Sequence, residues 1–176
     1  MIQIKDKQFV PLIDEQQLLQ RIEQLSQIIS NDYLDKNPLF IVILNGAFLF
    51  AAEVFKRLDI DCEITFTRLA SYIKTSSSGK VTMLMELPDN VTGRHVVIVE
   101  DIVDTGRTLA EFLPHLQLKK PASICIASLL TKPSALKENI NVDYLGFAIE
   151  DKFVVGFGLD YDEAGRNLRA IYQLKE

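Results

Sequence analysis

Hydrophobic positions near the start of the chain recur with the period of a helix. Leu18, Ile22, Leu25 and Ile29 follow one another at spacings of four, three and four residues, which places them on one helical face. Asp14 and Gln17 stand just before this face and form a capping-box-like pair. The pattern therefore predicts an amphipathic helix that opens at Asp14-Glu15-Gln16-Gln17.

Further along the chain, the apolar run 96–99 does not alternate with polar residues. Such runs are typical of strands buried on both faces, as in parallel sheets. Two intervening segments, 47–58 and 109–116, are predicted to be helices. Strands are expected at 39–44, 62–71, 81–87, 96–100, 123–130, 144–149, 153–157 and 170–173.

The alternation of strand and helix in the middle of the chain predicts an α/β fold with a doubly wound, mainly parallel sheet. The two ends are less regular. We expect one domain over residues 1–176, with a core at about 39–131 and a small hood subdomain built from about 1–12 and 132–176. A chain of 176 residues is long enough to bury a sizeable core as one domain.

Charge and composition exclude several classes of function. The formal net charge is −5, which disfavours a broad nucleic-acid-binding surface. The two cysteines, Cys62 and Cys125, fit no metal-binding spacing. The N-terminal residues lack the apolar core of a signal peptide, and no run reaches the roughly 18–20 apolar residues of a membrane span. A reduced, cytoplasmic setting without a membrane partner is expected.

The strongest chemical signal is the segment 96–109, VVIVEDIVDTGRTL. An apolar strand leads into Glu100 and Asp101, and Asp104 opens a turn that enters a helix. Ligands of open α/β sheets bind outside the carboxyl ends of the strands, which is where these acids are expected. Gly106 would let a phosphate approach the unpaired amides of the helix start. The segment thus indicates a phosphorylated sugar as ligand.

This segment resembles the phosphoribosyl-pyrophosphate (PRPP) motif of the type I phosphoribosyltransferases, without a break over residues 96–109. The resemblance implies that Glu100 and Asp101 bind the ribose hydroxyls and help to place Mg²⁺ with the diphosphate. Asp104 would face the purine N7 as a general base. The 5′-phosphate would be held by the amides and hydroxyls of the turn, Asp104, Thr105, Gly106, Arg107 and Thr108.

A second segment, 151–163, with Arg166 after it, is similar to the purine pocket of the hypoxanthine-guanine members of that family. By that resemblance Phe153 stacks on the purine and Val154 contributes backbone contacts to its edge. Asp160 would hold Mg²⁺, and Arg166 would meet the pyrophosphate. A flat aromatic face and fixed backbone groups suit a planar heterocycle. Taken alone, the same residues also fit an ordinary core strand.

Three shorter features complete the resemblance, which covers roughly residues 39–169. Lys132 stands where the family has a lysine that donates to the purine 6-oxo group, which favours 6-oxopurines over adenine. Asn45 and Gly46 form the loop that binds pyrophosphate through backbone amides, often with a cis peptide. The family commonly has a basic residue where Asn45 stands. Ser71 and Tyr72 match a Ser-Tyr pair on a lid loop, followed by the small polar tract 75–79.

The function implied is transfer of the phosphoribosyl group from PRPP to hypoxanthine or guanine, with Mg²⁺ as cofactor. The resemblance also implies a homodimer or homotetramer. Three alternatives stay open: a regulatory RNA-binding protein of the same fold, a phosphoribosyltransferase for another base such as xanthine, and, more distantly, a phosphoacceptor domain. The last needs acids and a lysine on separate strands, and it does not need the Thr-Gly-x-Thr turn.

Overall fold

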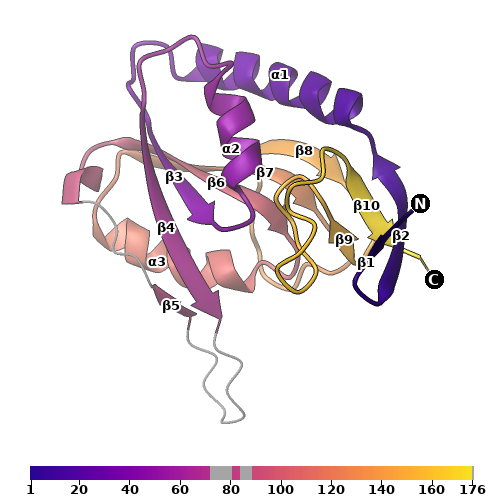
Figure 1. The fold of residues 1–176 in the computed structure, drawn as a ribbon. Coiled ribbons are helices and arrows are strands. Elements are labelled where there is room, and N and C mark those ends of the chain that lie inside the picture. The colour runs from indigo at the N-terminus through magenta and orange to yellow at the C-terminus, as the bar shows by residue number, and fades with distance from the viewer. Residues whose placement is uncertain (72–80, 84–88, 176) are drawn as a thin grey trace.

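A computed structural model describes residues 1–71, 81–83 and 89–175 and shows one large sheet with helices on both faces (Figure 1). Its strand order is β5-β4-β3-β6-β7-β8, and all neighbours are parallel except β5, which is antiparallel to β4. This confirms the predicted doubly wound, mainly parallel sheet. The strands are β3 (Leu39–Leu44), β4 (Glu63–Ser71), β5 (Val81–Met83), β6 (His95–Val103), β7 (Ser123–Thr131) and β8 (Tyr144–Ala148).

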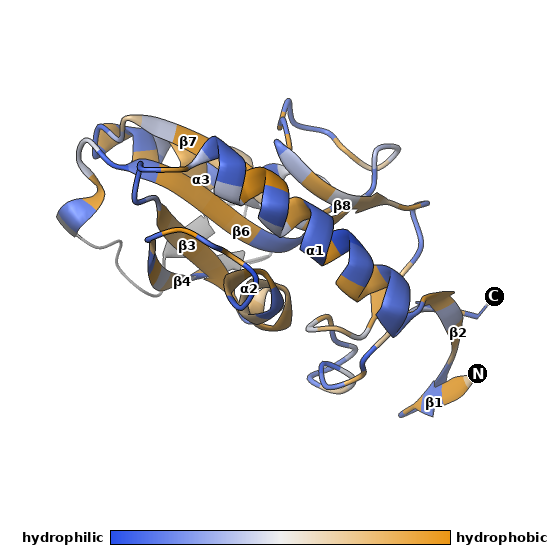
Figure 2. Ribbon diagram, turned by 90° about the horizontal axis from the view of Figure 1, so that it is seen from above, coloured by the Kyte–Doolittle hydropathy of each residue, from blue (hydrophilic) through white to orange (hydrophobic). Residues whose placement is uncertain are grey.

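Alternate residues of the central strands serve two separate cores. Phe40 and Val42 of β3 pack towards α1 (Glu15–Asp32) and α2 (Phe48–Phe55), whereas Leu39 and Ile41 pack towards α3 (Arg107–Leu118). Both faces are covered, so the strands are hydrophobic along most of their length, as Figure 2 shows for β3 and β6. A short 3₁₀ turn, η1 (Asp89–Val91), precedes β6.

The predicted elements are present in the described residues, and their ends differ in instructive ways; residues 84–87 of the predicted strand 81–87 lie outside the description. The capping box of Asp14 and Gln17 is confirmed, because each side chain accepts from the other residue's backbone N–H. Strand β6 runs to Val103, three residues beyond the predicted end at Glu100. The reason is its neighbour β7, since pairing with β7 continues to Thr131 after pairing with β3 has stopped at Val99. Glu100 and Asp101 therefore belong to the strand itself.

A second, antiparallel sheet of order β1-β2-β10-β9 joins the two ends of the chain, and both termini lie beside it (Figure 1). It consists of β1 (Ile2–Ile4), β2 (Lys7–Ile13), β9 (Val154–Val155) and β10 (Ile171–Leu174). The expected hood at 132–176 needs one correction. Strand β8 pairs with β7 and belongs to the main sheet, because its parallel register continues the buried apolar layer there.

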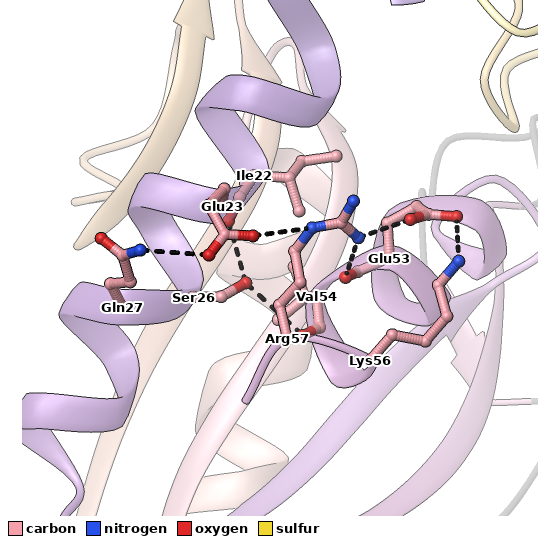
Figure 3. A network of polar contacts seen from close by, with 8 residues as sticks. All are labelled: Ile22, Glu23, Ser26, Gln27, Glu53, Val54, Lys56 and Arg57. Atoms are coloured by element: carbon pink, nitrogen blue, oxygen red, sulfur yellow. Dashed lines mark hydrogen bonds and ion pairs between the residues drawn. The ribbon is translucent and has the colours of Figure 1, made fainter. Parts of the chain in front are cut away.

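Helix α2 is tied to α1 by a group of polar contacts (Figure 3). The Arg57 guanidinium, just after α2, lies 3.1 Å from the Glu23 carboxylate of α1 and 2.5 Å from that of Glu53. The hydroxyl of Ser26 lies 3.4 Å from the carbonyl oxygen of Val54, within the buried layer between the helices. These contacts hold α2 in place, and the loop after β3 leads directly into the start of α2.

Two further observations bear on the expectations. In the described parts of the chain, no helix is long and apolar enough to cross a membrane. The predicted lid pair falls at the limit of the description: β4 ends at Ser71, and Tyr72 lies outside the described residues, as does the tract 75–79.

Candidate functional site

The candidate site lies where the chain changes direction across the main sheet. From β3 one connection leads through α2 to β4, and the chain later returns on the other side of β3 as β6. Crevices at such switch points, at the carboxyl ends of the strands, are the usual ligand sites of open α/β sheets. The loop Asn45–Gly46 follows β3, and the acids Glu100, Asp101 and Asp104 lie at the end of β6. The two motifs predicted from the sequence therefore meet at this point.

Gly46 and Asp101 are in direct contact. A Cβ atom placed on Gly46 would overlap the Asp101 carboxylate, so only glycine fits here. The peptide between Leu44 and Asn45 is cis. Gly46 is buried and Asn45 is exposed, which leaves the polar side chain of the loop facing outwards. A second glycine at this place is Gly158, where an added Cβ would overlap the carbonyl oxygen of Gly46.

Glu100 is a buried carboxyl, and the adjacent Asp101 is half-buried. Burial and the neighbouring Asp101 raise the pKa of Glu100 well above its ordinary value. Burial also raises the pKa of Asp101 to about 6, although the backbone amide of Ile102 and the Arg166 guanidinium act in the opposite direction. Oε2 of Glu100 is buried and has no hydrogen-bond partner among the described residues. A buried oxygen without a partner is suited to bind a hydroxyl donor of a ligand or a cation that the ligand brings.

Replacing Asp101 by asparagine is expected to stabilise the free protein. Asp101 binds its proton more tightly in the folded chain, with a pKa of about 6, than in the unfolded chain, at 3.8. The free energy of unfolding therefore falls as the pH rises from about 4 to above 6, by roughly 2–3 kcal/mol for this group. Urea unfolding at pH 5 and pH 8 should show a smaller decrease for Asp101→Asn. A variant less stable than the parent at pH 8 would contradict this reading of the site.

The turn after β6 has the geometry of an anion-binding helix start. Gly106 adopts a left-handed conformation, with φ of 80°, and α3 begins at Arg107. The first helical hydrogen bond joins the N–H of Ala110 to the carbonyl of Gly106, so the amides of the three preceding residues have no partner within the helix. The N–H of Lys137 donates to the carbonyl of Thr105 at 3.0 Å and fixes the turn from outside. Thr108 is half-buried and Arg107 exposed.

Lys132 lies beside Asp104 at the carboxyl end of the sheet. Its side chain is only 8% exposed, and its Nζ lies 3.2 Å from a carboxylate oxygen of Asp104. The same ammonium lies 3.3 Å from Asp151, in the segment between β8 and β9. The backbone N–H of Lys132 donates to the carbonyl of Val103, which connects the ends of β6 and β7. A buried ammonium with two acidic partners is thus held at the carboxyl end of β7.

Phe153 exposes about half of its surface, while the adjacent Val154 is buried. The ring of Phe153 packs edge-on against Tyr161, with ring centres 5.9 Å apart, and lies 6.4 Å from Phe9 of β2. Val154 pairs with Gln173 in the antiparallel sheet, which fixes its backbone. An exposed aromatic face held by other rings can accept a planar ligand.

Asp160 and Arg166 face each other across a tight turn. Nη2 of Arg166 lies 2.8 Å from Oδ1 of Asp160, and Oδ2 of Asp160 accepts the backbone N–H of Glu163 at 2.8 Å. A second guanidinium nitrogen of Arg166 donates to the carbonyl of Gly158. The pair therefore lies next to the contact of Gly158 with Gly46, at the loop after β3.

The predicted Mg²⁺ ligands do not form a ready-made metal site. Among the described residues no group of three histidine, cysteine, aspartate or glutamate side chains is arranged to hold a metal ion. Asp160 is paired with Arg166, and both of these charges act on the pKa of Asp101. The unpartnered oxygen of Glu100 and the carboxylate of the half-buried Asp101 are nevertheless hard oxygen donors of the kind that Mg²⁺ prefers. They suit a Mg²⁺ ion that retains water and takes its other ligands from a substrate.

Two residues of the site were not singled out from the sequence. Asp151 lies in the second segment, where the resemblance implies no role for it. Its contact with Lys132 joins residues that are nineteen positions apart in the sequence, so only the folded structure shows it. An acid two residues before the apolar run that starts at Phe153 was the available signal. Gly158 gave a weaker one, the repeated glycine in Gly156-Phe157-Gly158, where all three residues have positive φ.

Comparison with known proteins shows which family the chain belongs to. The family model for the phosphoribosyl transferase domain matches residues 12–162. A hypoxanthine-guanine phosphoribosyltransferase of Streptococcus pyogenes is 42% identical, covering 94% of this chain and 92% of the relative. A hypoxanthine-guanine-xanthine phosphoribosyltransferase of Tritrichomonas foetus is 38% identical, covering 94% and 91%.

The fold agrees as well. A crystal structure of a hypoxanthine phosphoribosyltransferase of Staphylococcus aureus matches with a TM-score of 0.90 and 36% identity, covering 97% of this chain and 93% of that one. The similarity extends well beyond residues 39–169, from which the resemblance was first drawn, because it includes the hood strands and α1. The chain belongs to the phosphoribosyltransferase family, in the group that contains the hypoxanthine-guanine phosphoribosyltransferases.

Proposed function

We propose that this protein transfers the phosphoribosyl group of PRPP to a 6-oxopurine, hypoxanthine or guanine, giving the nucleoside monophosphate and pyrophosphate. The observation that carries the proposal is the placement of Lys132 beside Asp104 at the carboxyl end of the sheet. It sets a donor for an exocyclic oxygen next to an acceptor for a ring proton. A 6-oxopurine offers both groups on neighbouring positions, whereas adenine presents a donor where Lys132 also donates.

The reaction breaks the bond between C1′ of the ribose and the diphosphate and forms a bond from C1′ to the purine. As the diphosphate leaves, C1′ gains positive character. Asp104 faces N7 and accepts the proton that the purine loses. Its carboxylate is about half exposed, so it can turn from Lys132 towards a bound base. A positioned acid–base group of this kind contributes about 10² to 10⁴ in rate.

The other residues position the two substrates. Glu100 and Asp101 accept hydrogen bonds from the ribose 2′ and 3′ hydroxyls, which would give the buried oxygen of Glu100 its missing partner. The 5′-phosphate rests on the turn of Thr105, Gly106, Arg107 and Thr108, at the helix start. Mg²⁺, when bound with PRPP, neutralises charge on the leaving diphosphate.

The purine base and the diphosphate would both contact residues 153–166 of the hood. Phe153 stacks on the purine, and the backbone at Val154 contacts its edge. Arg166 and the amides at Asn45 and Gly46 contact the diphosphate, with Asp160 as an additional metal ligand once Arg166 has turned to the substrate. The acidic partner of Arg166 keeps the guanidinium in place before PRPP binds.

The test is a spectrophotometric assay with PRPP, Mg²⁺ and each of hypoxanthine, guanine, xanthine, adenine and uracil. Turnover of 6-oxopurines alone is the expected result, and the ratios among the three define the preference. Turnover of adenine or uracil would contradict the role given to Lys132. PRPP binding without turnover of any base would favour the regulatory alternative. An RNA-affinity measurement at increasing salt would then test that alternative. The same outcome would make Asn45 the first residue to replace.

We also propose that the protein is a homodimer or homotetramer. Ile64 and Phe66, on one face of β4 near the sheet edge, are each 40% exposed, which is unusual for large apolar side chains on a strand. Sedimentation equilibrium of the parent and of Phe66→Ser would show whether this face is an interface. A monomeric parent would contradict the proposal.

The cytoplasmic setting expected from the sequence stays a prediction.

A further inference from the structure

Lys132 has more acidic partners than its proposed role requires. Its ammonium contacts Asp104 at 3.2 Å and Asp151 at 3.3 Å, although one carboxylate is enough to balance one charge. The three side chains differ sharply in exposure, at 8% for Lys132, 47% for Asp104 and 60% for Asp151. The lysine is thus the buried, fixed member of the group, and the two carboxylates approach it from the solvent side on different segments.

The two carboxylates have different tasks if the proposed function holds. Asp104 has to leave Lys132 in order to meet the purine ring, and it becomes neutral when it accepts a proton. A buried ammonium that loses its only counter-charge is strongly disfavoured. Asp151 is two residues before Phe153, the proposed stacking residue. It therefore belongs to the purine segment and not to the turn after β6 that carries Asp104. An ammonium has three donors, and it can hold Asp151 and a purine oxygen at the same time.

We infer that Asp151 is a positioning residue that holds the Lys132 ammonium at the purine edge while Asp104 engages the ring. This inference rests on the proposed function. Asp151 itself touches neither substrate in this arrangement and acts through Lys132. It also links the stacking residue to the donor that reads the 6-oxo group, so that the two base contacts are set by one segment.

The test compares Asp151→Asn with Asp151→Glu and with Glu150→Gln as a matched control. Glu150 is the neighbouring acid, is 83% exposed, and pairs with Lys152 on the surface instead of with Lys132. Asp151→Asn should raise the KM for hypoxanthine on the order of tenfold, the value of one charge-assisted hydrogen bond, and leave the KM for PRPP unchanged. Asp151→Glu should recover most of the loss, and Glu150→Gln should resemble the parent.

Binding of the nucleoside monophosphate IMP, measured by calorimetry, gives a second readout that does not need turnover. Weaker IMP binding by Asp151→Asn, with parental binding by Glu150→Gln, is the expected result. An unchanged KM for the base and unchanged IMP affinity would overturn the inference while leaving the proposed function intact. An equal rise in both KM values would indicate a general structural role and would also overturn it. A parent that neither turns over 6-oxopurines nor binds IMP would refute the proposed function and this inference together.

Discussion

Asp104→Asn is expected to lower kcat for 6-oxopurines by about 10² to 10⁴ while leaving PRPP binding nearly unchanged. Asparagine has the same shape and keeps the backbone amide of the turn, but it cannot accept the purine proton. It also loses the charge that pairs with Lys132 at 3.2 Å. Lys132 retains Asp151 as a counter-charge, so the fold of the site should persist. Steady-state kinetics with PRPP as the varied substrate, and calorimetric binding of PRPP with Mg²⁺, measure the two effects separately.

Asp61→Asn serves as the control for that experiment. Asp61 is exposed and precedes β4, at the amino end of that strand and not at the carboxyl ends where the site lies, and its replacement makes the same chemical change. It should behave as the parent in both measurements. If Asp104→Asn instead lost turnover and PRPP affinity to the same degree, Asp104 would be a substrate-binding residue and not the base.

Gly46→Ala is expected to reduce kcat/KM for PRPP by roughly 10²-fold or more. The added methyl group would occupy the position of the Asp101 carboxylate, so the loop and a proposed ribose ligand could not keep their places together. Displacements of about 1 Å at a reacting centre can cost this much. Because Gly158 packs on the carbonyl of Gly46, a shift of the loop would also disturb the turn that holds Arg166.

Gly93→Ala provides a contrast with the opposite expected pattern. An added Cβ at Gly93 meets nothing within 4 Å, but the residue has a φ of +74°, which alanine adopts at a cost of about 1–2 kcal/mol. This variant should lose thermal stability and keep its KM for PRPP. Gly46→Ala should instead show the large loss of kcat/KM for PRPP. Parental kinetics for Gly46→Ala would show that the loop and Asp101 can move apart without consequence for the site.

Much of the fold could be read from the sequence because its signals are local. The period of Leu18, Ile22, Leu25 and Ile29 and the capping pair before them specify α1 through contacts within a few residues. The end of β6 was placed three residues too early because strand length there depends on pairing with β7, which is a contact between distant segments. For the same reason β8 was assigned to the hood, although its partner is β7.

The site shows the same division. The sequence by itself determined the acids, the glycine turn and the purine segment, since each motif is contiguous and its chemistry resides in the residue types. Only the tertiary structure decided which of these side chains share a partner. It placed Asp151 on Lys132, set Gly158 against Gly46 and paired Asp160 with Arg166 in place of a preformed metal cluster. These contacts join segments from β3, β6, β7 and the hood, and their geometry depends on packing that no local pattern records.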